Sequence, residues 1–258
     1  MRVKADPGGF PDRKMSEVPV VAPDQMREIQ RIAQEDFGVD LLQITENAGR
    51  AAATVALAML GGRGQRQRIV VLAGGGSKGA AGLCAVRHLV NWGLVVEPIF
   101  GEVESEMSSI ARKQIQILRQ AGIVEPGDEA TSEITLEEHL EHADLVVDAL
   151  VGYGLVGPPT GIAAAITELA VAAKRPILAL DVPTGISATT GEVSEPAIRA
   201  VTTLVLDLPK KGVCDATCRQ FAGELYLADL GIPRSVHERM GIHVSGIFSE
   251  GPIVHLRR

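Results

Sequence analysis

The chain has 258 residues, of which 46% are hydrophobic and 22% charged, a composition typical of a globular protein and too apolar for a disordered one. The formal charge is −7, no cluster of lysine or arginine is long enough to neutralise a run of phosphates, and aromatic residues make up only 3%. We therefore expect neither duplex nor single-stranded nucleic acid as a partner.

The sequence contains no apolar segment near the roughly 20 residues that span a bilayer. Proline, glycine and charged residues stand at the amino terminus, where a signal peptide would need an apolar core. We expect a cytoplasmic protein with no membrane contact. The three cysteines, Cys84, Cys214 and Cys218, do not indicate a disulfide framework, and the last two lack a second ligand pair at zinc-site spacing.

Residues 1–20 are punctuated by proline and glycine and show no periodicity, which predicts a flexible extension ahead of a single domain over residues 21–258. Helical spacing begins at Pro23, with Met26, Ile29 and Ile32 on one face, and a second helix is expected over residues 44–60.

Apolar runs and helical segments then alternate. They predict strands over 68–74, 94–100, 144–150, 176–183, 202–209 and 224–231, with helices over 79–91, 106–120 and 162–173. Several strands are apolar at nearly every position, as burial on both faces by helices requires, so the sheet should be mostly parallel. Ligands of such sheets bind outside the carboxyl ends of the strands, which directs attention to the loops after Leu72, Leu150 and Leu180.

The first of these loops, residues 74–82, is rich in glycine. Gly74, Gly76 and Gly79 satisfy G-x-G-x-x-G, and Glu97 or Glu102 stands where a dinucleotide site would have its acidic residue. Glycines let the backbone approach a ligand, and the start of the following helix attracts an anion. A tight structural turn without a ligand is the alternative.

The second loop begins at Asp148, inside an otherwise apolar strand. A buried carboxylate needs a cation or several donors to offset its desolvation, so we expect either a functional partner or a buried lysine. Gly152, Gly154 and Gly157 then keep the following loop close to the sheet edge. The alternative is that Asp148 only caps or hydrogen-bonds the loop.

In the third loop, Asp181 ends a strand of pure hydrophobes. Pro183 and Gly185 restrict and sharpen the turn that follows, so Asp181 and Thr184 should be held rigidly. Such a placement suits a general acid or base, and Asp181 is the expected catalytic residue. A helix-capping role is the alternative, although no helical pattern begins directly after it.

Five segments in this order resemble the YjeF N-terminal domain family, whose characterised enzymes are NAD(P)H-hydrate epimerases. The segments are PDQMREIQRIAQEDFGVDLLQITENAG (23–49), VVLAGGGSKGAAGLCAVRHL, DLVVDALVGYGL, LALDVPTGISATTGEV and ELYLADLGIP. The resemblance implies a single three-layer α/β/α sandwich with a Rossmann-like sheet, assembled as a homodimer. It also implies an isomerase that interconverts the R and S forms of hydrated NADH or NADPH for a companion dehydratase that acts only on the S form.

Matched position by position, the resemblance assigns roles to three sets of residues. Asp181 contacts the substrate, and Asp148 and Thr184 hold a potassium ion with a third ligand. The expected substrate-binding residues are those of the two glycine-containing loops: Gly76, Ser77, Lys78, Gly79, Ala80, Ala81, Gly152, Tyr153, Gly154, Leu155, Val156, Gly157 and Pro158.

The first loop departs from the family pattern, because residues 77–81 read SKGAA where the family has Asn-Asn-Gly-Gly-Asp. Lys78 stands at the third potassium ligand, and an ammonium cannot coordinate a cation. We hypothesise that Lys78 occupies the place of the metal; pointing into solvent and contacting a substrate phosphate are the alternatives. The departure also supports a catalytically silent member that binds a nucleotide-like ligand or a protein partner. A nicotinamide-dependent oxidoreductase is a third reading.

A few other polar residues are weaker candidates. Glu46 and Asn47 either line the site or fasten their helix to its neighbours, and His88 should be packed. His139 and His142 are expected on an exposed surface. Lys210 and Lys211 follow a strand near the expected ligand edge; we expect them to be solvated, with contact to a phosphate as the alternative.

Overall fold

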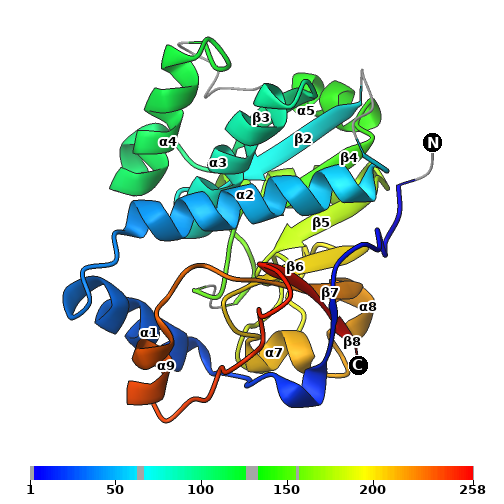
Figure 1. Ribbon diagram of the computed structural model, residues 1–258. Helices are drawn as coiled ribbons and strands as arrows, with labels where there is room; N and C mark the ends of the chain where they lie inside the picture. Colours follow the sequence, from blue (N-terminus) through cyan, green and yellow to red (C-terminus); the bar gives the residue numbers. More distant parts are fainter. Residues whose placement is uncertain (1–2, 63–66, 126–132, 155–156, 258) are drawn as a thin grey trace.

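The computed structural model describes residues 3–62, 67–125, 133–154 and 157–257. In these residues, eight strands form one sheet with the order β1-β8-β7-β6-β5-β4-β2-β3 (Figure 1). All neighbouring strands are parallel except β7 and β8. The strands are Asp12–Lys14 (β1), Arg68–Ala73 (β2), Val95–Phe100 (β3), Leu145–Ala149 (β4), Ile177–Leu180 (β5), Thr202–Leu206 (β6), Glu224–Ala228 (β7) and Ile253–Arg257 (β8).

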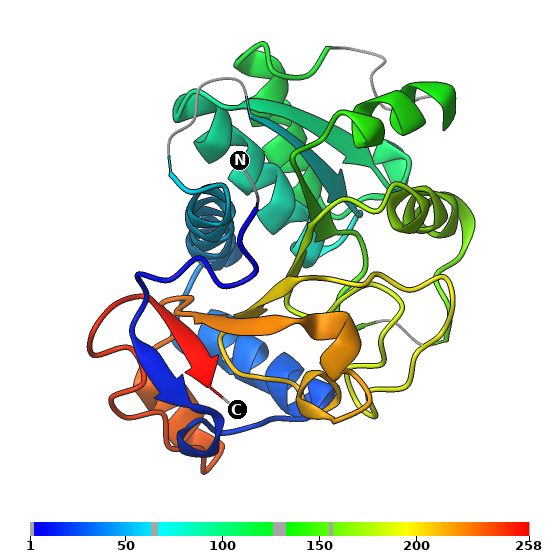
Figure 2. The same cartoon turned by 90° about the vertical axis from the view of Figure 1, so that its right-hand side faces the viewer.

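Helices cover both faces of this sheet (Figures 1 and 2). The α-helices are Pro23–Glu35 (α1), Leu41–Met59 (α2), Ser77–Asn91 (α3), Ser109–Gln120 (α4), Glu133–Glu141 (α5), Gly161–Ala172 (α6), Lys211–Cys214 (α7), Arg219–Ala222 (α8) and Arg234–Arg239 (α9), with 3-10 turns at Met15–Glu17 (η1) and Glu104–Glu106 (η2). Within the described ranges, no helix has both the length and the apolar character needed to cross a bilayer.

Alternate residues of β2 belong to two separate hydrophobic clusters, which shows why the sheet has two covered faces. Ile69 and Val71 pack with apolar residues of α2, α3 and α4, while Val70 and Leu72 pack with those of α5 and α6. Side chains of a strand point alternately to opposite faces, so an apolar strand can bury both sides only between two helical layers. The predicted α/β/α sandwich with a mostly parallel sheet is confirmed.

The segment that we expected to be a flexible extension carries the edge strand of the sheet. β1 pairs in parallel with β8, placing Asp12 beside His255. Two residues that precede β1 are also held: Asp6 accepts a hydrogen bond from Tyr226 (2.6 Å), and the carbonyl of Ala5 accepts one from Thr202 (2.6 Å). These contacts tie residues 5–14 to β6, β7 and β8.

The register of the central strands brings the three predicted loops to one edge. Leu72 of β2 lies beside Asp148 of β4, which in turn lies beside Ala179 of β5. Because these strands are parallel, their carboxyl ends meet at the same edge, and the loops that follow them are neighbours.

Candidate active site

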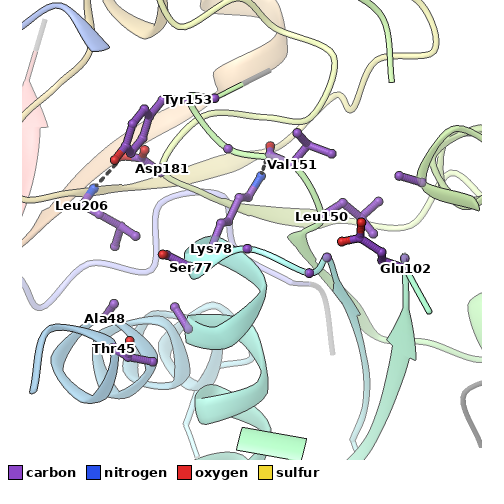
Figure 3. Close-up of a pocket in the computed structure, with 18 of the residues that line it drawn as sticks. Thr45, Ala48, Ser77, Lys78, Glu102, Leu150, Val151, Tyr153, Asp181 and Leu206 are labelled. Carbon is purple, nitrogen blue, oxygen red and sulfur yellow. Dashed lines mark hydrogen bonds between the residues drawn. The ribbon is translucent and has the colours of Figure 1, made fainter. Parts of the chain in front are cut away.

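A cavity of about 540 Å3 lies at this carboxyl edge, within the size range of small-molecule sites. The loops after β2, β4 and β5 line it, together with residues of α1, α2 and α6 and of the segments after β3, β6 and β7. Figure 3 shows Lys78 and Ser77 at the start of α3, Thr45 and Ala48 on α2, and Asp181 beside Tyr153.

The first loop can be built only with glycine at two positions. A Cβ on Gly74 would stand 1.9 Å from the carbonyl oxygen of Leu150, and one on Gly79 would stand 1.7 Å from the carbonyl oxygen of Gly74. Gly76 and Ser77 line the cavity together with Lys78 and Ala81, whereas Gly79 and Ala80 are buried behind this surface. The loop therefore presents its backbone and the start of α3 to the cavity.

Lys78 and Asp148 form a closed buried pair. The Lys78 ammonium donates to Asp148 Oδ2 (3.1 Å) and to the carbonyls of Val151 (3.0 Å) and Val182 (2.9 Å), and it lies 3.4 Å from Thr184 Oγ1. The remaining positions of the carboxylate are satisfied by Leu150 N, Thr184 N and Thr184 Oγ1, which all donate to Asp148. The buried lysine that the sequence leads us to expect as one possible partner of Asp148 is thus present.

Burial and the neighbouring Asp148 act on the pKa of Lys78 in opposite directions. Burial lowers the pKa of Lys78 from its usual value, and the charge of Asp148 raises it in part. Lys78 does not extend into solvent, since its side chain is 6% exposed. The alternative of a solvent-exposed lysine is therefore wrong.

Asp181 and Lys210 form a second buried pair, which is open on one side. Lys210 Nζ donates to Asp181 Oδ1 (2.6 Å) and to the carbonyl of Leu206 (2.7 Å), and Leu206 N also donates to Asp181 Oδ1 (3.2 Å). Within the described ranges, no hydrogen bond reaches Asp181 Oδ2, although Asp181 lines the cavity and is 3% exposed. One carboxylate oxygen is therefore left for a ligand.

The backbone at Asp181 is held in an uncommon conformation. Its φ is +63°, in the left-handed region that few residues other than glycine adopt, and Val182 N donates to Leu180 O across it. Such turns occur where the surroundings over-determine them, often at functional sites. Among the described residues, the next element after Asp181 is β6 and no helix begins directly after Asp181, so the helix-cap alternative is wrong.

The loop after β4 covers the open pair with an aromatic ring. Tyr153 lies with its ring centre 5.6 Å from Lys210 Nζ, and its hydroxyl donates to Gln30 (2.7 Å). Burial and the charge of Asp181 raise the pKa of Tyr153 to about 12, so its hydroxyl stays protonated. Gly152 and Gly154 also line the cavity, whereas Gly157 and Pro158 are exposed beside it. Leu155 and Val156 lie outside the described residues.

The burial of Lys210 and its pairing with Asp181 are the features of the site that sequence reasoning missed. We expected Lys210 and Lys211 to be solvated, and this is wrong for Lys210, which is 1% exposed. Lys211 is exposed. The available signal was Asp181 itself, because a carboxylate at the end of a fully apolar strand needs a charge partner from a neighbouring strand end.

The other weaker candidates lie away from the cavity. Asn47 donates to the carbonyl of Leu230 (2.9 Å), and Glu46 accepts from the buried His88 (2.8 Å), so both residues fasten α2 to its neighbours. His139 and His142 are half-buried and exposed, respectively, and neither lines the cavity. Of the two residues that could be the acidic residue of a dinucleotide site, Glu102 lines the cavity and Glu97 does not.

Glu46, Cys84 and His88 form the one group of three potential metal ligands found in the described part of the chain. Burial and the charge of Glu46 raise the pKa of the Cys84 thiol to about 12, and the Arg87 guanidinium donates to Glu46. A protonated thiol beside a fixed cation is a poor metal site. We interpret this group as a hydrogen-bonded contact between α2 and α3.

The fold and the cavity together define a class of protein. A parallel sheet between helical layers, with a glycine-lined cavity at the carboxyl edge and a buried carboxylate facing it, is typical of α/β proteins that bind a small molecule and act on it.

Comparisons with known proteins identify the family within this class. Residues 41–212 match the family described as YjeF-related protein N-terminus. An NAD(P)H-hydrate epimerase of Dehalogenimonas lykanthroporepellens is 40% identical over 226 residues, which cover 87% of this chain and 86% of that protein. The corresponding enzyme of Rhodopirellula baltica is 32% identical over 84% of this chain and 86% of its own length. The chain belongs to the YjeF N-terminal family.

Two further matches agree with this assignment. A bifunctional NAD(P)H-hydrate repair enzyme Nnr of Thermofilum pendens is 32% identical over 83% of this chain, which spans 40% of that relative's length. The crystal structure of the yeast protein YNL200c matches the fold with a TM-score of 0.78 at 24% identity, covering 93% of this chain and all of the yeast chain.

Proposed function

We propose that this protein is an NAD(P)H-hydrate epimerase that interconverts the R and S forms of hydrated NADH or NADPH, with Asp181 as the acid/base. Two relatives that match over most of their length, at 40% and 32% identity, carry this name. The observation that carries the proposal is the Asp181 carboxylate, which is fixed through Oδ1 by Lys210 and the Leu206 amide while Oδ2 has no protein partner among the described residues.

The proposed epimerisation requires an acid/base group and a surface that holds the dinucleotide, and the cavity has residues suited to both. The hydrated nicotinamide carbon carries a hydroxyl group and the ring nitrogen, so its configuration can invert by ring opening: the hydroxyl loses its proton, the carbon–nitrogen bond breaks to leave an aldehyde, and the nitrogen takes up a proton. Closure of the ring on the other face of the aldehyde reverses these transfers, so no atom is gained or lost overall and one group that accepts and returns a proton can serve both directions. A rigidly held carboxylate within reach of the substrate can do this. The glycine-containing loops, including Gly76, Gly152 and Gly154, would hold the dinucleotide, with the start of α3 near a phosphate.

The experiment mixes the protein with R,S-hydrated NADH and an excess of an S-specific dehydratase, and follows consumption of the R form. We expect the wild-type protein to accelerate this consumption and Asp181→Asn to lower the rate by about 10²–10⁴-fold. Asp24→Asn, an exposed aspartate on α1, is the matched control and should keep wild-type activity.

Two results would decide against the proposal. R-form consumption no faster than spontaneous epimerisation would favour the silent, ligand-binding or partner-binding family member. An unchanged rate in Asp181→Asn would remove Asp181 from the mechanism while leaving the activity in place.

We also propose that the protein acts as a homodimer in the cytoplasm, as the family resemblance implies. Light scattering coupled to size-exclusion chromatography measures the first property, with twice the 27.2 kDa chain mass expected. Fractionation of source cells measures the second.

A further inference from the structure

The closed pair between α3 and β4 has the composition of a cation site. Four oxygen atoms surround the Lys78 nitrogen at 2.9–3.4 Å: a carboxylate oxygen of Asp148, a hydroxyl oxygen of Thr184, and the carbonyl oxygens of Val151 and Val182. They come from β4 (Asp148) and from the loops after β4 and β5, whereas the nitrogen comes from the start of α3. Carboxylate, hydroxyl and carbonyl oxygens are the donor set that hard metal cations take in proteins.

The hydrogen-bond directions show which form of the lysine fits this site. Carbonyl oxygens cannot donate, and the Thr184 hydroxyl hydrogen is directed to Asp148 Oδ1 (2.7 Å), so the oxygens around the nitrogen act as acceptors. An ammonium has three donors and no acceptor, which matches this surrounding, whereas a neutral amine would turn a lone pair toward an oxygen.

The aliphatic part of Lys78 is also fitted to the loop above it. A Cβ on Gly152 would stand 3.4 Å from Lys78 Cβ and 3.5 Å from its Cδ, so the lysine stem runs along the backbone of the second loop. Figure 3 shows the stem reaching from the first turn of α3 to the Val151 carbonyl. The Lys78 side chain thus packs along this loop while its nitrogen contacts the four oxygens.

The potassium ion that the family resemblance implies does not fit these residues. Asp148 and Thr184 are the two ligands that the resemblance assigns to it, and both are hydrogen-bonded to Lys78 or lie against it. An ion between them would need the same oxygens as the ammonium, and two positive charges at that distance repel each other in a buried site.

We propose that the Lys78 ammonium is a built-in replacement for this metal ion, so the protein assembles its cavity without potassium. The ammonium connects the loops after β4 and β5 to α3, as a bound ion would connect them. Because the cation that contacts these oxygens is part of the chain, the structure of the cavity should not depend on which salt is in solution. The inference concerns the pocket of the proposed epimerase, but its test does not depend on that activity.

The experiment compares thermal unfolding in about 100 mM potassium chloride and in N-methylglucamine chloride at the same ionic strength, so that general screening cancels. We expect the midpoint of the wild-type protein to be equal in both salts. Lys78→Asn replaces the ammonium with a neutral carbonyl ligand, and we expect its midpoint to be lower than wild type and to rise by about 5 °C in potassium, because an ion that binds only the native state stabilises it. Lys211→Asn, a change at an exposed lysine, is the control and should show no potassium-specific rise.

Either of two results overturns the proposal. One is a saturable, potassium-specific rise in the wild-type midpoint. The other is a folded Lys78→Asn protein that does not respond to potassium.

A second measurement covers the case in which Lys78→Asn does not fold. Calorimetric titration of the wild-type protein with potassium chloride should show no saturable binding, and Lys78→Arg, which retains a cation, should fold and unfold at the same temperature in both salts. Saturable binding to the wild type, or a potassium response of Lys78→Arg, overturns the proposal.

Activity assays in the same two salts separate this inference from the proposed function. Equal epimerase rates in both salts agree with both proposals. Complete inactivity in both salts would overturn the epimerase proposal and leave the midpoint measurements to decide on Lys78.

Discussion

The two buried lysine–aspartate pairs of this protein lie at the same sheet edge but differ in what they leave unpaired. In the pair of Lys78 and Asp148, both carboxylate oxygens have protein donors and the ammonium is surrounded by oxygens. In the pair of Lys210 and Asp181, the partners converge on Oδ1. A lysine and an aspartate therefore form a fully hydrogen-bonded structural contact in one place. In the other, they leave one carboxylate oxygen for a ligand.

The backbone at each carboxylate agrees with this division. Asp148 lies within β4, where ordinary strand geometry points it inward, and it is fully buried. Asp181 lies one residue beyond β5 in left-handed backbone, and it borders the cavity. Completeness of the hydrogen bonding thus distinguishes a group that holds the fold from one that is kept for a ligand.

The largest effect that tests this comparison is the stability of Asp148→Asn. Removing one partner leaves the Lys78 ammonium buried without a counter-charge, which should lower the free energy of unfolding by about 3–5 kcal/mol. Urea unfolding measures this loss. Asp181→Asn is the matched control and should lose clearly less, because Lys210 keeps the Leu206 carbonyl and the cavity admits water. Equal losses in the two variants would contradict the division into closed and open pairs.

An intermediate effect is expected from Lys210→Met. This side chain holds Asp181 by one oxygen, so its loss should let the carboxylate rotate and lower kcat by about tenfold, with little change in KM. The coupled epimerase assay measures both constants. Lys210→Arg should recover part of the rate, and Lys211→Met, next to it but exposed, should leave the rate unchanged. A fall confined to stability would show that Lys210 is only a structural residue.

A third buried pair, His237 with Asp207, extends the comparison to a histidine. Burial lowers the pKa of His237, but the hydrogen bond that His237 donates to Asp207 (2.9 Å) and the charge of Asp207 outweigh this effect, and the net direction is upward. A raised folded-state pKa means that the contribution of His237 to stability is fully present below its unfolded value of about 6.5 and is lost as pH rises through the folded value.

The expected result is a small pH-dependent difference between wild type and His237→Gln. The stability advantage of the wild type should shrink as pH rises above about 6.5, measured by urea unfolding at several pH values. An advantage that is constant or grows over this range would show that the histidine is not held in its charged form by Asp207.

Much of the fold follows from the sequence because its central strands are buried on both faces. Apolar runs such as 68–74 and 144–150 predict β2 and β4 within a residue or two. β1 and β8 were not predicted, since each lies at or near the edge of the sheet and forms mainly through its pairing with another strand. Short helices such as α7 and α9 have too few turns to show a periodicity.

Part of the candidate site could also be predicted from the sequence, and part could not. Asp148 and Asp181 were predictable because a charged residue in an apolar strand stands out in the sequence. Lys210 was not, because a lysine that follows a strand is usually solvated, and only the tertiary fold shows that the end of β6 turns it toward Asp181. Whether the residues of the glycine loops bind substrate stays a prediction.

The glycines of the first loop set the limits within which the cavity can be redesigned. Positions 74 and 79 are closed to any larger residue, because a single added carbon would collide with main-chain atoms. At Gly76 the corresponding carbon would meet no atom within 4 Å, and the backbone φ of −93° is one that any amino acid accepts. A library intended to retune ligand size should therefore vary residue 76 and leave Gly74 and Gly79 unchanged.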